Sequence, residues 1–242
     1  MNKKRFLKSL FVLPMVVMFS SCGLWPDGAV GKGSIVEQNI NVTGFNAIEA
    51  SSSAEVTVVE GDSLQITLSD YENLIEFWDI KVVNNTLVVQ TKPLTSLVNS
   101  KAKISVVLPG DLTEVKVSGS GDIKLNSAFP ELERVSISGS GNINGNVNSD
   151  YSSLNLNISG SGSLSFNGTA NVLNAKITGS GKMYLSDLVA KDVICNVSGS
   201  GNMYLNAIVS LKVVITGSGD IVYSGNPTVD IQTSGSGRLR HN

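Results

Sequence analysis

Residues 115–124 read VKVSGSGDIK, and residues 135–144 read VSISGSGNIN. In both stretches, Ser-Gly-Ser-Gly separates two short segments in which apolar and polar residues alternate. Alternation with a period of two is typical of a β-strand that buries one face. Glycine fits at a bend where a side chain would not. Each stretch therefore predicts two strands joined by a tight corner.

The motif [ST]-G-S-G occurs seven times, and successive first glycines are 20, 21, 19, 20, 18 and 18 residues apart. Apolar residues recur two and four residues before the first glycine and four residues after it. This shared register favours parallel stacking over repeated antiparallel hairpins, and a fixed period marks a solenoid. We therefore expect an all-β protein, a right-handed parallel β-helix with coils of about 20 residues. The motifs contain 14 of the 24 glycines: Gly119, Gly121, Gly139, Gly141, Gly160, Gly162, Gly179, Gly181, Gly199, Gly201, Gly217, Gly219, Gly235 and Gly237.

A second periodic position lies seven residues after each first glycine, where Asn predominates. Asn tolerates left-handed backbone geometry and hydrogen-bonds locally, as turns require. Side chains stacked between coils could also bond along the rod. We expect a structural turn ladder here, in preference to a glycan or metal site. It would comprise Asn126, Asn146, Asn167, Ser186, Asn206, Ser224 and Asn242.

Residues 35–110 are rich in strand-forming residues but lack the motif. The sequence ASSSA at residues 50–54 resembles a diverged first corner, with Ser and Ala in place of Gly. Residues 80–83 and 87–90 flank Asn84-Asn85 and predict a hairpin. We expect irregular N-terminal coils, with this hairpin in a cap over one end of the rod.

Three further features bear on the ends of the rod. Residues 103–109 predict another strand. Residues 69–72 match a capping box that would begin one short helical turn. Arg238 and Arg240 should protect the last exposed strand, because charge on an edge strand discourages pairing with other chains.

The N-terminus has the composition of a targeting segment. Four basic residues within residues 3–8 precede an apolar run at residues 10–19, which is too short to span a bilayer. Ser20 and Ser21 then precede Cys22, which resembles a bacterial lipoprotein signal peptide, although Phe19 stands where Leu is usual. The alternative is an ordinary secretory peptide that is cleaved nearby.

The lipoprotein interpretation divides the chain into three parts. Residues 1–21 would be the signal peptide, residues 22–34 a tether lipidated at Cys22, and residues 35–242 one β-helical domain. That domain would comprise irregular coils at 35–110 and seven Gly-Ser-Gly coils at 111–242. Without residues 1–21 the chain keeps 14 basic and 20 acidic residues, a net charge of −6. Acyl chains rather than charge would therefore hold it at the membrane.

Composition excludes several classes of function. The formal charge is −2 and only 16% of residues are charged, so there is no footprint of nucleic-acid binding. The single histidine, His241, adjoins the C-terminus, which disfavours a Ser-His-Asp triad, a Cys-His pair or a multi-histidine zinc site. We expect no cofactor and no metal site.

Several stretches together resemble a known family. They are the Ser-Gly-Ser-Gly coils, ENLI at 72–75, LVV at 87–89, Leu108-Pro109, and GNP at 225–227 before the last motif. Over residues 38–240 the chain is similar to the head GIN domain family, whose members are described as auto-transporter adhesins. The resemblance implies an envelope-exposed β-helical protein without catalytic residues.

Few residues on the predicted rod could carry chemistry. Asp122 and Asp220 lie in equivalent positions five coils apart, so they cannot act as a pair. Acidic residues between 55 and 110 leave an enzymatic site open, although solvated loop acids are the simpler interpretation. Cys195 falls in the inward layer and should be a buried thiol without a disulfide. Tyr184 and Tyr204 fall on the outer face, as a ligand-contact ladder for sugar or as cross-strand packing.

Three functions are consistent with these patterns. The first is a non-enzymatic, lipid-anchored outer-membrane protein, facing the periplasm or the cell surface, that acts as an adhesin for a glycan or a protein. The second is an envelope scaffold that associates with itself as a homo-oligomer. The third is a polysaccharide-active β-helix enzyme.

Overall fold

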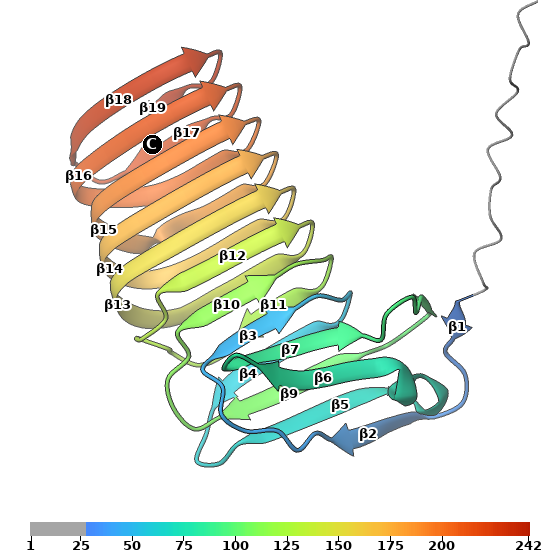
Figure 1. Cartoon of the computed structure of the whole chain (residues 1–242). Helices are drawn as coiled ribbons and strands as arrows, with labels where there is room; N and C mark the ends of the chain where they lie inside the picture. Colours follow the sequence, from blue (N-terminus) through green and yellow to red (C-terminus); the bar gives the residue numbers. More distant parts are fainter. Residues whose placement is uncertain (1–27) are drawn as a thin grey trace, which may run out of the picture.

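A computed structural model describes residues 28–242 of the chain, shown as coloured ribbon in Figure 1. The proposed signal peptide at 1–21 and Cys22 lie outside the described residues. The described residues are mostly β-strand and include one 3-10 helix, η1 (Glu72–Phe77). The strands are β1 (Ala29–Val30), β2 (Ile35–Asn39), β3 (Ala47–Ala50), β4 (Glu55–Glu60), β5 (Gln65–Tyr71), β6 (Trp78–Val83), β7 (Thr86–Thr91), β8 (Leu97–Val98), β9 (Lys103–Leu108), β10 (Glu114–Val117), β11 (Asp122–Leu125), β12 (Arg134–Gly139), β13 (Asn142–Gly160), β14 (Ser163–Gly179), β15 (Lys182–Gly199), β16 (Asn202–Gly217), β17 (Ile221–Ser224), β18 (Thr228–Gly235) and β19 (Leu239–His241).

The expected parallel β-helix is confirmed, and it makes about six turns. Strands that lead into the Gly-Ser-Gly corners stack in parallel on one face of the rod, which we call the entry face. Strands that leave the corners stack in parallel on the opposite face, the exit face. The long strands β13 to β16 run along the exit face and continue onto the entry face (Figure 1).

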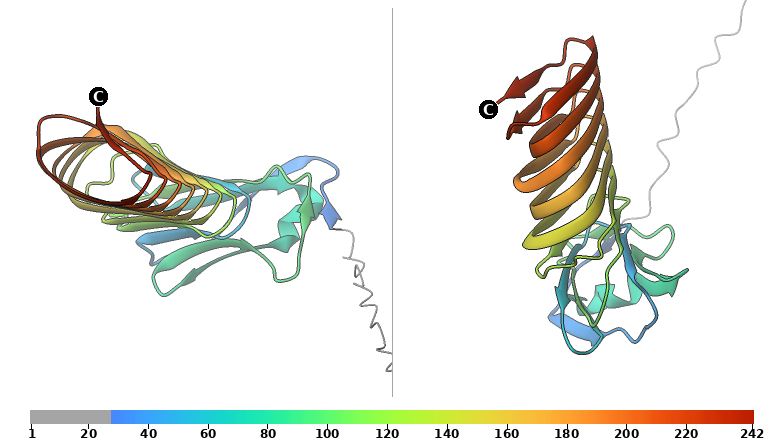
Figure 2. Two further views of the ribbon diagram at one scale, coloured as in Figure 1. Left: turned by 90° about the horizontal axis from the view of Figure 1, so that it is seen from above. Right: turned by 90° about the vertical axis from the view of Figure 1, so that its left-hand side faces the viewer.

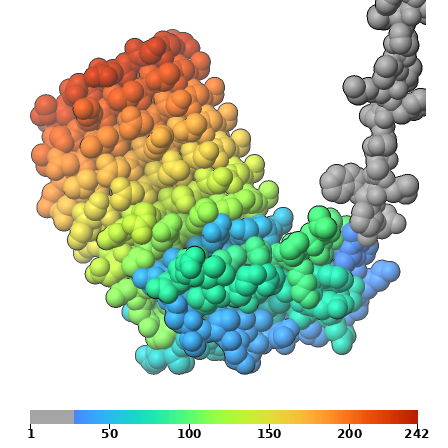
Figure 3. All heavy atoms as spheres, in the orientation of Figure 1, coloured from blue at the N-terminus to red at the C-terminus, as the bar shows by residue number. Residues whose placement is uncertain are grey.

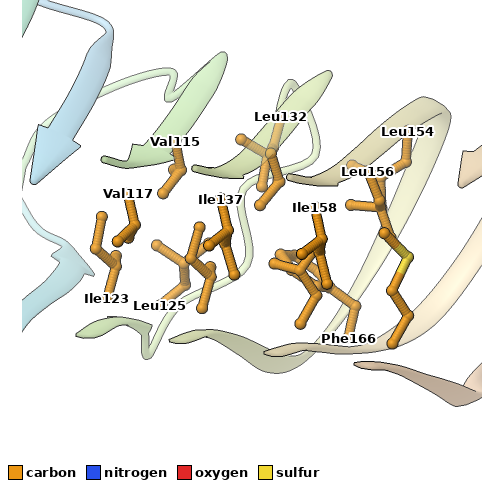
Figure 4. Packing of buried hydrophobic residues seen from close by; sticks show 14 of the residues in the cluster. Val115, Val117, Ile123, Leu125, Leu132, Ile137, Leu154, Leu156, Ile158 and Phe166 are labelled. Carbon is orange, nitrogen blue, oxygen red and sulfur yellow. The ribbon is translucent and has the colours of Figure 1, made fainter. Parts of the chain in front are cut away.

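The interior of the rod is filled by side chains from both faces. Ile137 and Ile158 of the entry face and Ile123 and Phe166 of the exit face point inward (Figure 4), and each is at most 1% exposed. These are the positions that the sequence placed in register around each first glycine. Burial of such side chains contributes roughly 1.5–3 kcal/mol each and is the main stabilising term of the fold.

The corner glycines stack directly on one another along the rod. A Cβ on Gly139 would lie 2.4 Å from the carbonyl oxygen of Gly119, and one on Gly141 would lie 2.0 Å from that of Gly121. The same close approach recurs at every later motif up to Gly235 and Gly237. Glycine is therefore required because the next backbone occupies the space of a side chain.

The coils at the N-terminal end do not follow the order of the sequence. β3 and β4 form the coil next to β10 and β11, which confirms residues 50–54 as a diverged corner. The following coil outward is formed by β7 and β9, which pair in parallel with β3 and β4. The coil of β7 and β9 therefore lies farther from the regular coils than the coil of β3 and β4, although it comes later in the sequence. Blue and green layers consequently alternate at this end in Figure 3.

Antiparallel strands cap the N-terminal coil. β6 and β7 form the expected hairpin, with Asn84 and Asn85 at positive φ, and β5 and β2 extend the exit face beyond β9. The expected short helical turn is confirmed as η1, but the expected capping box is wrong, because η1 begins at Glu72 without a side-chain cap. Asp70, a member of that stretch, is instead fully buried.

Candidate binding surface

Tyr184 and Tyr204 form a stacked pair on the exit face. Strands β15 and β16 pair them directly, and their ring centroids are 5.6 Å apart with an interplanar angle of 1°. Tyr184 is 45% exposed, whereas Tyr204 is partly covered. The register that places Met183 and Met203 inward dictates this outward placement, because side chains alternate along a strand.

The stack determines which ring faces are free. Because the two rings are parallel and belong to adjacent coils, their faces point along the rod axis. Tyr204 lies between Tyr184 and Val222, whereas the far side of Tyr184 adjoins the much smaller Ser165. Tyr184 therefore offers the free aromatic face of this pair, above the Ser165 position. The sequence indicated two equivalent rings, and the packing makes them unequal.

Polar side chains form a row beside this pair, three residues after each first glycine. The Asn142 amide donates a 2.8 Å hydrogen bond to Asp122, and Ser163 donates to Asn142. Further along, the backbone N–H of Asp220 donates to Asn202. The expected Asn ladder is wrong in its position: seven residues after the glycines, the described chain shows no side-chain bonds between successive members. The ladder forms three residues after the glycine because those strand positions repeat without register shifts, whereas irregular pairing begins between 145 and 149.

A cleft lies where the cap meets the rod. It has a volume of 710 Å³ and lies between the first corner, residues 51–53, and the segment 91–103. Half of the residues that line it are Ser or Thr, and the others include Glu55, Trp78, Leu97, Asn99, Lys101 and Lys103. The cleft has no local signal in the sequence, because only the stacking of β9 on β4 brings the two segments together.

Asp70 holds one wall of the cleft. Its carboxylate accepts hydrogen bonds from Trp78 Nε1 at 3.1 Å, Ser100 Oγ at 2.7 Å and the backbone N–H groups of Tyr71 and Lys101 at 2.8 and 2.9 Å. Every donor is neutral, and the side chain is 0% exposed. Four donors around one buried carboxylate are a structural arrangement that fixes segment 91–103 against the rod.

The other acidic residues between 55 and 110 do not converge on a site. Glu55 accepts from Lys124 at 2.6 Å. Asp79 accepts from Lys81 at 2.6 Å and from Gln90 at 2.8 Å, and these hydrogen bonds hold its pKa below the usual value. Within residues 28–242, no three His, Cys, Asp or Glu side chains are grouped so that they could hold a metal ion.

Cys195 lies in the inward layer, as the sequence predicted. Its side chain is 0% exposed, in register between Ala175 and Val213. Burial raises the pKa of the thiol to about 12. At neutral pH the group is therefore a protonated, unreactive part of the core.

Comparison with solved structures identifies the same fold in three bacterial proteins. A protein from Bacteroides fragilis described as a putative adhesin is 22% identical with a TM-score of 0.75, and the match covers 89% of this chain and 100% of that one. A protein from Parabacteroides distasonis described as a putative lipid binding protein is 24% identical with a TM-score of 0.71, and the match covers 88% and 98%. A putative adhesin from Parabacteroides merdae is 23% identical with a TM-score of 0.67, over 89% and 99%.

The remaining comparisons concern sequence. No curated protein matches the chain. Among the described residues, no helix is long and apolar enough to cross a membrane. The model of one family, described as "Putative auto-transporter adhesin, head GIN domain", matches residues 44–227. The match begins just before β3 and ends just before β18, so it includes nearly all of the β-helix, and the chain belongs to this head GIN domain family.

Proposed function

We propose that this protein is a non-enzymatic, lipid-anchored adhesin of the bacterial envelope, and that it binds a glycan on the exit face. The single observation that carries the choice of site is the free face of Tyr184 above Ser165. Membership of a family described as adhesins supports the general role. The sequence of residues 1–22 supports attachment through Cys22 to the outer membrane.

The chemistry around Tyr184 suits a sugar. An aromatic face packs against the C–H groups of a pyranose ring, and nearby hydroxyl, amide and ammonium groups can hydrogen-bond its hydroxyls. Lys182 and Asn202 lie two positions away on the same strands as Tyr184 and Tyr204, so they point to the same side of the sheet. The rod holds these groups on regular strands, which reduces the entropic cost of ordering them on binding.

The interior of the rod argues against a lipid as the ligand, although one structural neighbour is described as a lipid binding protein. A bound acyl chain would require an apolar cavity. In the described coils that volume is occupied by side chains such as Leu164, Met183 and Met203, each 0% exposed. We therefore assign lipid to the anchor and glycan to the outer surface.

A polysaccharide-active enzyme is the weaker alternative. Glycosidases need two carboxyl groups within roughly 5–10 Å of each other across the bond to be cleaved. Asp122 and Asp220 belong to different coils, and Asp70 is buried beneath four donors. The 710 Å³ cleft is a second candidate glycan site, because half of the residues that line it carry hydroxyl groups.

The proposal is tested on a glycan array with the full chain carrying Cys22→Ser. Tyr184→Ala should weaken binding of the recognised glycan about tenfold, and Tyr184→Phe should preserve it because the ring remains. Tyr204→Ala is the matched control and should have the smaller effect, because its faces are covered by its neighbours. Equal binding by the wild type and Tyr184→Ala would reject this face as the site. Loss of binding on Asn99→Ala instead would assign the glycan to the cleft.

A further inference from the structure

The C-terminal end of the rod exposes its interior. Val229 and Ile231 of β18 pair in register with Leu211 and Val213 of β16. Leu211 and Val213 are 1% and 0% exposed, whereas Val229 and Ile231 are 37% and 44% exposed. Positions that are buried in the preceding coils therefore face solvent in the last one. This last coil forms the free end of the rod (Figure 2).

The backbone edge is open at the same end. In the described chain, β18 pairs only with β16, and β19 pairs only with β17. The sequence of β18, TVDIQTSG, contains no Lys, Arg or Pro, the residues that commonly block such edges. The expected protection by Arg238 and Arg240 is therefore confined to the exit face, beside and within β19. Arg240 is also engaged there by Asp220 at 3.0 Å.

The opposite end of the rod is closed by the chain itself. Leu74 of η1 is 0% exposed, and Ile66 and Leu68 of β5 are each 1% exposed. The closure adds antiparallel strands to both faces: β6 beside β7 on the entry face, and β5 followed by β2 beside β9 on the exit face. Both faces of this solenoid can thus be extended by antiparallel strands.

We infer that a second copy of this chain covers the open end, tail to tail, so that β18 of each copy pairs antiparallel with β19 of the other. Within one coil, β18 and β19 run in opposite directions on opposite faces. A two-fold axis parallel to the strands places the entry face of one copy next to the exit face of the other. The rotation leaves the direction of each strand along the axis unchanged, so β18 of one copy runs opposite to β19 of the other. It therefore extends both faces with antiparallel strands at once and buries Val229 and Ile231 of both copies. Such an isologous contact closes on itself as a dimer.

The charges favour the pairing of β18 with β19 of the other copy over the pairing of β18 with β18. Asp230 lies five residues before Gly235, and Arg240 lies five residues after it. The two-fold operation preserves distance from the corner, so Asp230 of each copy meets Arg240 of the other. Pairing β18 with β18 would instead place side by side two strands that each carry Asp230 and no basic residue. Asp230 has no ion-pair partner within residues 28–242, and opposite charges across a contact select among such arrangements.

Sedimentation of the full chain with Cys22→Ser tests the inference. We expect a concentration-dependent dimer, and Ile231→Lys should raise its dissociation constant at least tenfold, because a buried unpaired ammonium opposes association. Ile194→Lys is the matched control: Ile194 is also 44% exposed on the entry face, but it lies two coils from the end. It should leave the dimer intact. A monomer at every concentration, or equal effects of the two lysines, would overturn the inference.

Covalent capture tests the arrangement of strands. Gln232 and Arg238 lie three residues before and after Gly235, so the proposed two-fold brings them together across the contact. With Cys22→Ser present, the double variant Gln232→Cys with Arg238→Cys should oxidise to a covalent dimer, and each single variant should not. Cross-linking by Gln232→Cys alone would mean that β18 pairs with β18 and would refute the geometry. The buried Cys195 remains in all variants as an inert background.

Discussion

Asp70 and Trp78 are joined by a 3.1 Å hydrogen bond from Nε1 of the indole to Oδ2 of the buried carboxylate. The bond links the end of β5 to the first residue of β6 across η1. The same carboxylate also binds Ser100 and Lys101 in the segment that follows β8. One side chain thus connects the three segments that close the N-terminal end of the rod.

Replacement of Asp70 should destabilise the cap strongly. Asp70→Ala leaves the Trp78 indole N–H, the Ser100 hydroxyl and two backbone N–H groups without their acceptor in a buried site, so we expect a loss of roughly 3–5 kcal/mol in the free energy of unfolding. Denaturant unfolding followed by circular dichroism measures it. Asp79→Asn is the control, because Asp79 is partly exposed on the same cap and should cost less than about 1 kcal/mol. Equal losses would show that Asp70 does not hold the cap.

Gly139 in a corner and Gly110 outside the corners allow two costs of adding a side chain to be measured separately. One is the cost of backbone strain, and the other is the cost of a clash with the neighbouring coil. Gly139 has φ +142° and its Cβ would meet the Gly119 carbonyl, whereas Gly110 has φ +134° with no atom within 4 Å of its Cβ. Gly110→Ala should therefore cost about 1–2 kcal/mol from strain alone. Gly139→Ala should cost at least about 2 kcal/mol more, because two stacked coils must separate. Equal midpoints of denaturation for the two variants would contradict the stacking explanation.

The regular coils were predictable from sequence because each repeats one physical requirement. An inward Ile or Val, an excluded side chain at the corner and a polar outer position recur with the period of the rod, so a register of seven motifs was enough to place Ile137 and Cys195 in the core. The ASSSA corner was also recognisable, since Ser and Ala are the smallest replacements for Gly. The turn residues Asn84 and Asn85 between two apolar segments were sufficient to predict the hairpin without any repeat.

Features that depend on contacts distant in sequence were not predictable. The pattern at 69–72 fitted a cap for a helix, yet Asp70 faces Trp78 and Ser100, and only the folded cap brings Ser100 to it. The placement of β7 and β9 beneath β3 and β4 reverses the order of coils, which no local periodicity encodes. The unequal exposure of Tyr184 and Tyr204 depends on their neighbours in adjacent coils rather than on the residues themselves.

The buried thiol makes stability depend on pH in the alkaline range. Burial raises the pKa of Cys195 from 9.0 to about 12, so above pH 9 the unfolded chain releases this proton while the folded chain keeps it. The contribution to stability is complete below pH 9 and is lost progressively as pH rises from 9 toward 12. Cys195→Ala should be less stable at pH 7 because of the cavity, but its free energy of unfolding should fall less steeply from pH 8 to pH 10. Parallel slopes for the two proteins would contradict the assignment.

Attachment to the membrane is expected to depend on Cys22 alone. The lipobox-like sequence ending in Cys22 predicts a thioether-linked lipid, and two or more acyl chains are needed for stable anchoring. Cys22→Ala should therefore move the protein from the membrane pellet to the soluble fraction and abolish incorporation of labelled palmitate. Cys195→Ala is the matched control and should remain in the pellet, because that thiol is buried in the core. If Cys22→Ala remains in the pellet, the lipid anchor is wrong and the mature chain must be held by another contact.

The orientation of the anchored rod is tested by adding protease to intact cells. If the protease cleaves the wild-type protein, the rod faces outward, as an adhesin requires. Protection in intact cells with cleavage after lysis would place the rod in the periplasm and exclude adhesion.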